Sequence, residues 1–192
     1  IDPGVISGQP DGRVARAMFE GLAIPDPITL EPTPGQAYRW EISRDGLTYT
    51  FHLRPGLKWS NGSPLIAPDF LWAWRRVIRP ETASRNANLM YPIFNAEAFN
   101  KGEISDITQV GMSAPDDSTF VVRLASPTSY FLFLTQYYTF LPVPRVEVDH
   151  DEHVVLGVRD QLLVLGLEPA QVLEPLQRGV LAPDRVQLLD ER

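Results

Sequence analysis

The amino-acid sequence predicts a mixed α/β domain that is followed by a tail of short helices. Apolar residues alternate with polar residues along 47–54, which is the period of a β-strand with one buried face. Along 67–80 they recur every three or four residues, which is the period of an amphipathic helix. Segments of both kinds are interspersed along 1–145, and this arrangement favours the mixed α/β class.

The beginning of the chain predicts one helix and one strand. Residues 1–12 are typical of an extended, turn-rich segment, and residues 13–24 predict a helix. The apolar residues of that helix have helical spacing: Val14, Ala17, Met18 and Leu22. A proline-rich loop over 25–35 and a short strand over 37–43 follow.

The stretch DGLTYTFHLRPGLKWSNGSP, residues 45–64, predicts a β-hairpin. One face of its first strand carries four apolar residues: Leu47, Tyr49, Phe51 and Leu53. Pro55-Gly56 then turns the chain, and residues 57–59 return as the second strand. Asn61-Gly62 predicts another tight turn, because both residues tolerate a positive φ.

Residues 67–80 predict a helix that begins with Pro68 in its first turn and ends at Pro80. Its apolar stripe consists of Phe70, Trp74, Val77 and Ile78, whereas Arg75, Arg76 and Arg79 are expected to face water. We expect five aromatic residues of the domain to be substantially buried: Trp40, Phe51, Trp59, Phe70 and Trp74.

The rest of the domain predicts short elements. Residues 82–103 are typical of two helical turns around Pro92. A strand over 118–124 follows a turn and presents Phe120, Val122 and Leu124 on one face. The last helix is predicted to be capped by Ser126 and to end at Pro142.

The composition changes at Arg145. All nineteen aromatic residues lie in 1–145, which has 14 acidic and 13 basic residues, whereas 146–192 has 10 acidic and 4 basic residues. The balanced charge of the domain gives no indication of a nucleic-acid partner. No apolar run approaches the roughly 20 residues of a membrane-spanning helix, and the absence of cysteine excludes disulfides and thiolate metal sites.

No residue pattern predicts catalysis, a cofactor or a metal. Ser7 is not in a Gly-x-Ser-x-Gly elbow. The cluster of Asp149, His150, Asp151, Glu152 and His153 contains two imidazoles that could share a helix face, but an exposed acidic loop explains it better because no third ligand has suitable spacing. We therefore expect the chain not to be an enzyme.

Taken together, several stretches resemble a known family. They are IDPGVISGQPDGRVARAMFEGL, YTFHLRPGLKWSNGSPLIAPDFLWAWRRVIRPETAS, LMYPIFNAEAFNKGE, GMSAPDDSTFVVRLASPTSYF and PVPR. In this order they are similar to the extracytoplasmic solute-binding proteins of the oligopeptide ABC-transporter family, in its oligopeptide-binding branch, up to about Arg145. The resemblance implies part of a type II periplasmic-binding-protein fold, mainly its small second domain.

The resemblance also implies a domain division and a set of ligand contacts. Residues 1–19 match the start of the first lobe, 20–145 match the second domain, and 146–192 form an unrelated tail. The extended segment that pairs its backbone with a bound peptide matches Ser7, Gly8 and Gln9. Asn86 stands where the family often has a tyrosine beside the ligand, and Ile66 stands where it usually has a capping threonine.

By resemblance, the chain is expected to bind oligopeptides outside the cytoplasmic membrane, in the periplasm or its equivalent, and to deliver them to permease subunits of an ABC importer. The closing lobe would follow Arg145, so we expect a truncated copy with impaired binding. The chain begins without Met or a signal-like segment, which indicates a removed leader or a fragment. The alternative is a standalone interaction module whose tail helices pair with another subunit.

Overall fold

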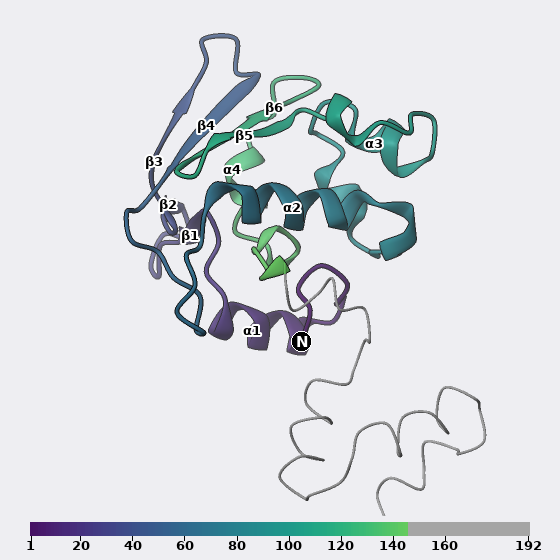
Figure 1. Ribbon diagram of the computed structural model, residues 1–192. Helices are drawn as coiled ribbons and strands as arrows, with labels where there is room; N and C mark the ends of the chain where they lie inside the picture. Colours follow the sequence, from purple (N-terminus) through teal and green to yellow (C-terminus); the bar gives the residue numbers. More distant parts are fainter. Residues whose placement is uncertain (146–192) are drawn as a thin grey trace, which may run out of the picture. The chain divides into compact units, whose positions relative to one another are not determined.

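The computed structural model describes residues 1–145, all of which belong to one compact unit. An antiparallel four-stranded sheet has the order β3-β4-β6-β5 (Figure 1). Its strands are β3 (Ala37–Ile42), β4 (Thr48–Leu53), β5 (Met112–Asp116) and β6 (Thr119–Arg123). A separate two-stranded sheet pairs β1 (Ala23–Pro25) with β2 (Pro32–Pro34). The mixed α/β class is confirmed.

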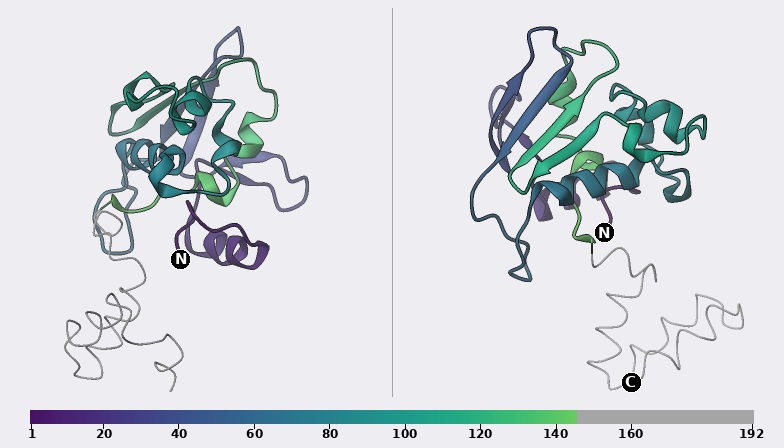
Figure 2. Two further views of the ribbon diagram at one scale, coloured as in Figure 1. Left: turned by 90° about the vertical axis from the view of Figure 1, so that its right-hand side faces the viewer. Right: turned by 45° about the horizontal axis from the view of Figure 1, so that its top comes forward.

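The helices lie mainly on one side of the larger sheet. The α-helices are α1 (Gln9–Met18), α2 (Ala67–Ile78), α3 (Ala96–Asn100) and α4 (Phe131–Leu134). The 3-10 turns are η1 (Pro80–Thr82), η2 (Ala87–Met90), η3 (Ile107–Gln109) and η4 (Tyr138–Phe140). Helix α2 packs against β5 and β6, and η4 contacts both α2 and α1, so α1 lies on the far side of α2 from the sheet (Figures 1 and 2).

The periodicity of β4 and α2 is confirmed by their burial. Tyr49, Phe51 and Leu53 are buried and alternate with half-buried neighbours. In α2 the four apolar residues predicted to face the core are all buried: Phe70, Trp74, Val77 and Ile78. At the start of α2, the backbone N–H of Ile66 donates to the Asp69 carboxylate at 3.0 Å, which is one half of a capping box, whereas Ile66 has no side-chain acceptor for the other half.

The predicted hairpin partner of β4 is wrong. Residues 57–59 do not pair with β4, whose neighbours in the sheet are β3 and β6. The hairpin turn lies instead at Gly46, where φ is 70° and the Ser43 N–H donates to the Thr48 carbonyl at 2.9 Å. Residues 57–65 make a small loop of their own around Gly62, joined by a bridge between Lys58 and Pro64.

The hydrophobic core is built around Trp74. Its ring meets Phe120 edge-on at 5.0 Å and Phe140 edge-on at 4.9 Å between centroids, the geometry that aromatic quadrupoles favour. Its indole N–H donates to the Phe140 carbonyl at 2.8 Å. Helix α2 is thereby fixed between the sheet and η4.

Several local predictions are corrected by long-range packing. Arg75 and Arg76 are half-buried rather than facing water, whereas Trp40 and Trp59 are mostly buried, although less than Phe51, Phe70 and Trp74. The helix predicted from Ser126 begins only at Phe131. Strands β1, β2 and β5 were not predicted, because prolines interrupt their short alternating patterns.

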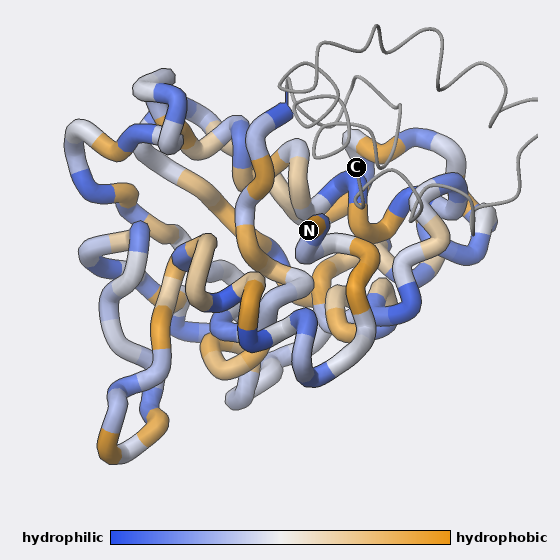
Figure 3. Tube along the Cα trace, turned by 90° about the horizontal axis from the view of Figure 1, so that it is seen from below, coloured by the Kyte–Doolittle hydropathy of each residue, from blue (hydrophilic) through white to orange (hydrophobic). Residues whose placement is uncertain are grey.

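The apolar stretches of the described chain are short (Figure 3). No helix among residues 1–145 is both long and apolar enough to cross a membrane.

Candidate functional site

The N-terminal segment 2–8 is held against the body of the domain by side chains from distant parts of the chain. Arg76, in α2, forms an ion pair with Asp2 at 2.6 Å. The Ser84 hydroxyl donates to the Gly4 carbonyl at 2.5 Å, and the Asn86 amide donates to the Ile6 carbonyl at 3.1 Å. Three side chains thus bind every second residue of the segment.

A second contact of Asn86 connects this segment to α1. The Asn86 amide also lies 3.3 Å from the Tyr138 hydroxyl, which accepts a hydrogen bond from Tyr137 at 2.9 Å. That hydrogen bond, together with burial, raises the pKa of Tyr137. The Tyr138 ring is fully buried against Gly12 of α1, where an added Cβ would lie 2.5 Å from the ring.

The residues predicted to pair with a peptide lie directly after these contacts. Ser7 is exposed, and among the described residues nothing hydrogen-bonds to its backbone N–H or C=O. Gly8 is extended, with φ −85° and ψ 147°, and its carbonyl accepts from Gly12 at 3.0 Å. Gln9 is the first residue of α1, so the extended part ends at Gly8 and not at Gln9.

Asn86 was predicted as a peptide contact by its place in the sequence. In the structure its side chain is bound to Ile6 and Tyr138, and it is half-buried. The partners Arg76 and Ser84 were not predicted as site residues. Neither has a local signal, because their bonds reach residues 74 and 80 positions away in the sequence.

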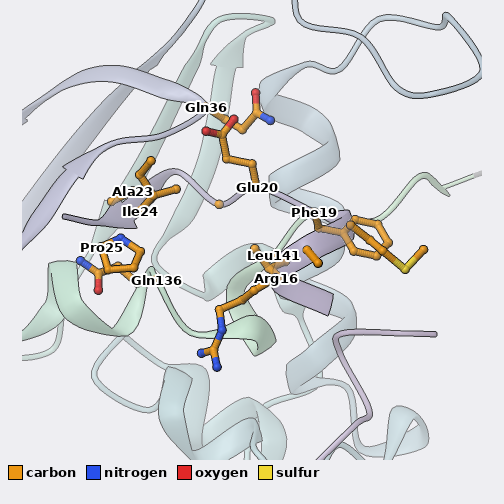
Figure 4. Close-up of a pocket in the computed structure, with 12 residues that line it drawn as sticks. Arg16, Phe19, Glu20, Ala23, Ile24, Pro25, Gln36, Gln136 and Leu141 are labelled. Carbon is orange, nitrogen blue, oxygen red and sulfur yellow. The ribbon is translucent and has the colours of Figure 1, made fainter. Parts of the chain in front are cut away.

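A groove of about 510 Å³ lies beside the C-terminal end of α1, between this helix, β1 and the residues around Leu141 (Figure 4). Arg16 and Glu20 are its charged lining residues, and Glu20 forms an ion pair with Arg54 at 3.0 Å. Gln36 and Gln136 also line it, and each has one buried amide atom without a hydrogen-bond partner. The free amide atoms of Gln36 and Gln136 could form hydrogen bonds with a polar ligand in the groove, and the apolar lining residues could contact its apolar parts.

Within residues 1–145 there is no group of three or more side chains able to hold a metal ion. The cluster between Asp149 and His153 lies outside the described residues. Charged groups of the described residues form ion pairs such as Arg76 with Asp2, and Arg39 and His52 share the Glu41 carboxylate. The described domain thus has two separate features that suit binding: the exposed backbone of Ser7 before α1, and the groove at the C-terminal end of that helix.

Comparison with known proteins identifies the family to which the chain belongs. The family model described as bacterial extracellular solute-binding proteins, family 5 Middle, matches residues 31–156. The chain belongs to this family. Proteins of this class bind their ligands without transforming them, which supports the prediction that the chain is not an enzyme. The match continues beyond Arg145, the point at which the resemblance was expected to end.

Three relatives illustrate the similarity. The oligopeptide-binding protein OppA of Bacillus subtilis is 42% identical over 143 residues, which are 74% of this chain and 26% of that protein. The probable deoxycholate-binding periplasmic protein YgiS of Escherichia coli is 39% identical over 147 residues, 76% of this chain and 27% of that protein. The crystal structure of Haemophilus influenzae OppA in complex with RPPGFSPFR has a TM-score of 0.75 and 37% identity, covering 81% of this chain and 30% of that one. The chain spans about a quarter of the length of the curated relatives.

Proposed function

We propose that this chain is part of an oligopeptide-binding component of an ABC importer, which works outside the cytoplasmic membrane and delivers peptides to permease subunits. The observation that carries the proposal is the free backbone of Ser7, next to the extended Gly8. An exposed, extended edge with unpaired N–H and C=O groups can accept a peptide as an added strand.

Binding through the backbone would allow the site to accept peptides of many different sequences. The N–H and C=O of Ser7 would exchange hydrogen bonds with the main chain of the peptide, whatever side chains that peptide carries. The Gly8 N–H adds a further donor, because no described residue accepts from it. Gln9 follows this edge in the sequence as the first residue of α1. Asn86 lies next to the edge in space, because its amide binds the carbonyl of Ile6, the residue before Ser7.

We expect the 192 residues taken alone to bind peptides weakly. In water each hydrogen bond of the edge contributes only about 1 kcal/mol net. Association costs at least about 4 kcal/mol of translational and rotational freedom. The expected dissociation constant for tri- to pentapeptides is therefore weaker than about 1 mM, which corresponds to about 4 kcal/mol.

Calorimetric titration of the chain with a mixed pool of tri- to pentapeptides tests this affinity. Micromolar binding would show that the edge does not need a second lobe. Titration of the ¹⁵N-labelled chain with trialanine tests the place of binding, and the largest shifts are expected at the amides of Ser7 and Gly8. Shifts produced by deoxycholate and not by trialanine would contradict a peptide ligand.

Two substitutions at one position separate backbone pairing from steric effects. Gly8→Ala and Gly8→Pro both add a Cβ, which would lie 2.9 Å from the Asp11 carboxylate. Only Gly8→Pro removes the N–H. Weaker binding of trialanine is expected for Gly8→Pro relative to Gly8→Ala. The alternative function, pairing through tail helices, concerns residues 146–192, which lie outside the described part of the chain.

A further inference from the structure

We infer that Ser84 and Asn86, together with Arg76, are positioning residues: they hold residues 2–6 in place so that the unpaired backbone of Ser7 is presented to a peptide. This inference rests on the proposed function. It differs from the role suggested by sequence position, in which residue 86 touches the ligand itself.

The unpaired backbone at Ser7 supports this role. Residues 6–8 lie outside any helix or turn, and Gly8 is extended. Asn86 binds the Ile6 carbonyl at 3.1 Å, whereas no described residue bonds to the N–H or C=O of the next residue, Ser7. Holding Ile6 in place therefore fixes where the free backbone groups begin.

The contact between Arg76 and the N-terminal segment is itself partly shielded from water and tightly packed. The Arg76 and Asp2 side chains are only 14% and 28% exposed, so water screens their attraction less than that of a surface pair. An added Cβ at Gly4 would lie 3.1 Å from the Arg76 guanidinium and 3.3 Å from Val77. The segment therefore lies directly on α2, with little room to shift.

The backbone before Ser84 is strained in a way that suits its contact. Ala83 has φ 51° and ψ 34°, the left-handed conformation that residues with a Cβ rarely adopt. Such a conformation persists only where surrounding contacts maintain it. Here it reverses the chain after η1, and the next residue, Ser84, donates its hydroxyl to the Gly4 carbonyl.

Asn86 connects the edge to the packing of α1 as well. Its amide reaches both the Ile6 carbonyl and the Tyr138 hydroxyl. Ile6 also packs against a small hydrophobic cluster of buried residues: Ala15, Tyr138 and Leu141. Asn86 thus contacts the N-terminal segment and η4 directly, and it is linked to α1 through Ile6 and Tyr138, which pack together with Ala15.

The test uses the ¹⁵N-labelled 192-residue chain and two measurements. Hydrogen exchange is followed at the Val5 and Ile6 amides, which both donate to the Asp2 carbonyl at 3.2 Å and report whether the segment stays in place. Trialanine is then titrated into the same samples while the Ser7 and Gly8 amides are observed. The first measurement needs no ligand, so it can be interpreted even where binding is weak.

Asn86→Ala is expected to accelerate exchange at Ile6 and to weaken trialanine binding about fivefold, the equivalent of about 1 kcal/mol. Ser84→Ala should accelerate exchange and weaken binding in the same direction, and Ser84→Thr, which keeps the hydroxyl, should restore both. The matched control is Asn88→Ala in η2, the 3-10 turn that Asn86 precedes, because Asn88 is exposed and its side chain has no hydrogen bond among the described residues. It should change neither measurement.

Each outcome supports or contradicts the inference. Unchanged binding and exchange in Asn86→Ala would overturn it and leave the proposed function standing. Weaker binding with unchanged exchange would mean that Asn86 contacts the peptide directly, which also overturns it. If trialanine shifts no amide near Ser7 in the unsubstituted chain, the proposed function fails, and this inference fails with it.

Discussion

Asp116 shows how a single side chain sets the geometry of a turn. Its carboxylate accepts hydrogen bonds from the Ser118 N–H and the Ser118 hydroxyl, both at 2.8 Å, at the turn between β5 and β6. These bonds favour the ionised carboxylate. The Ser118 hydroxyl is the largest cause, followed by the Ser118 N–H, and together they lower the pKa of Asp116 below its ordinary value of 3.8.

The lowered pKa gives a prediction for stability in acid. A carboxylate whose pKa is lower in the folded state stabilises the fold above its unfolded pKa, and that contribution is lost as the pH falls through the folded value. Asp116→Asn should therefore lower the urea midpoint at pH 7, and the difference should vanish well below pH 3.8. Urea titrations across this range measure it.

The matched control for this experiment is Asp117→Asn. Among the described residues no hydrogen bond reaches the Asp117 carboxylate, so its replacement should leave the midpoint nearly unchanged at pH 7. Equal effects of the two substitutions would show that net charge, and not the turn, determines the difference.

At the scale of one element, α2 connects the larger sheet to the short helical segments of the domain. Trp74 packs between Phe120 and Phe140 and donates to the Phe140 carbonyl. Trp72, in the same helix, is only half-buried, and no hydrogen bond reaches its indole among the described residues. The two tryptophans thus form a matched pair within one helix.

Trp74→Phe is expected to lower the free energy of unfolding by about 2–4 kcal/mol, because it leaves a cavity and an unpaired buried carbonyl. Trp72→Phe should cost less than about 1 kcal/mol, because that side chain is partly exposed and has no hydrogen bond to lose among the described residues. Urea denaturation followed by circular dichroism measures both. Similar losses in the two variants would contradict the burial of Trp74 as the cause.

Helices and strands could be predicted from the sequence where the spacing of apolar residues matches the face that the folded domain buries. Strand β4 and helix α2 have one buried face each, so their periods were sufficient. The pairing of β4 with β6 could not be predicted, because Tyr49 and Val122 are partners from distant segments. The residues of the candidate site follow the same rule. Ser7 could be proposed from the family resemblance, but the contact of Arg76 with Asp2 could not be predicted, because the two residues are 74 positions apart in the sequence.

At the scale of the whole molecule, the aromatic residues are concentrated in the described part of the chain. All nineteen lie in 1–145, and the buried ones include Trp74 and Phe120 at the sheet and Tyr138 beside α1. The domain boundary expected from the sequence, between residues 19 and 20, would separate α1 from Tyr138 and Leu141, which pack against this helix. Tyr138 is fully buried in the small hydrophobic cluster that also contains Ala15 of α1.

A chain of residues 1–145 is therefore expected to unfold cooperatively in urea, and a chain of residues 20–145 to fold with lower stability. Removing α1 uncovers Tyr138 and Leu141, and each large apolar side chain that is exposed costs about 1.5–3 kcal/mol. Intrinsic tryptophan fluorescence measures both transitions. Equal midpoints would show that residues 1–19 contribute nothing to the domain.

The anchors of the N-terminal segment have a consequence for biosynthesis. Gly4 and Ile6 are made early, but their partners Ser84 and Asn86 are each 80 positions later. Tyr138, which completes the contact of Asn86, is made later still. At about 5–20 residues per second, the ribosome needs on the order of ten seconds to reach it. Residues 2–6 therefore find their native neighbours late, and the ligand edge is assembled only when nearly all of the described domain has been made.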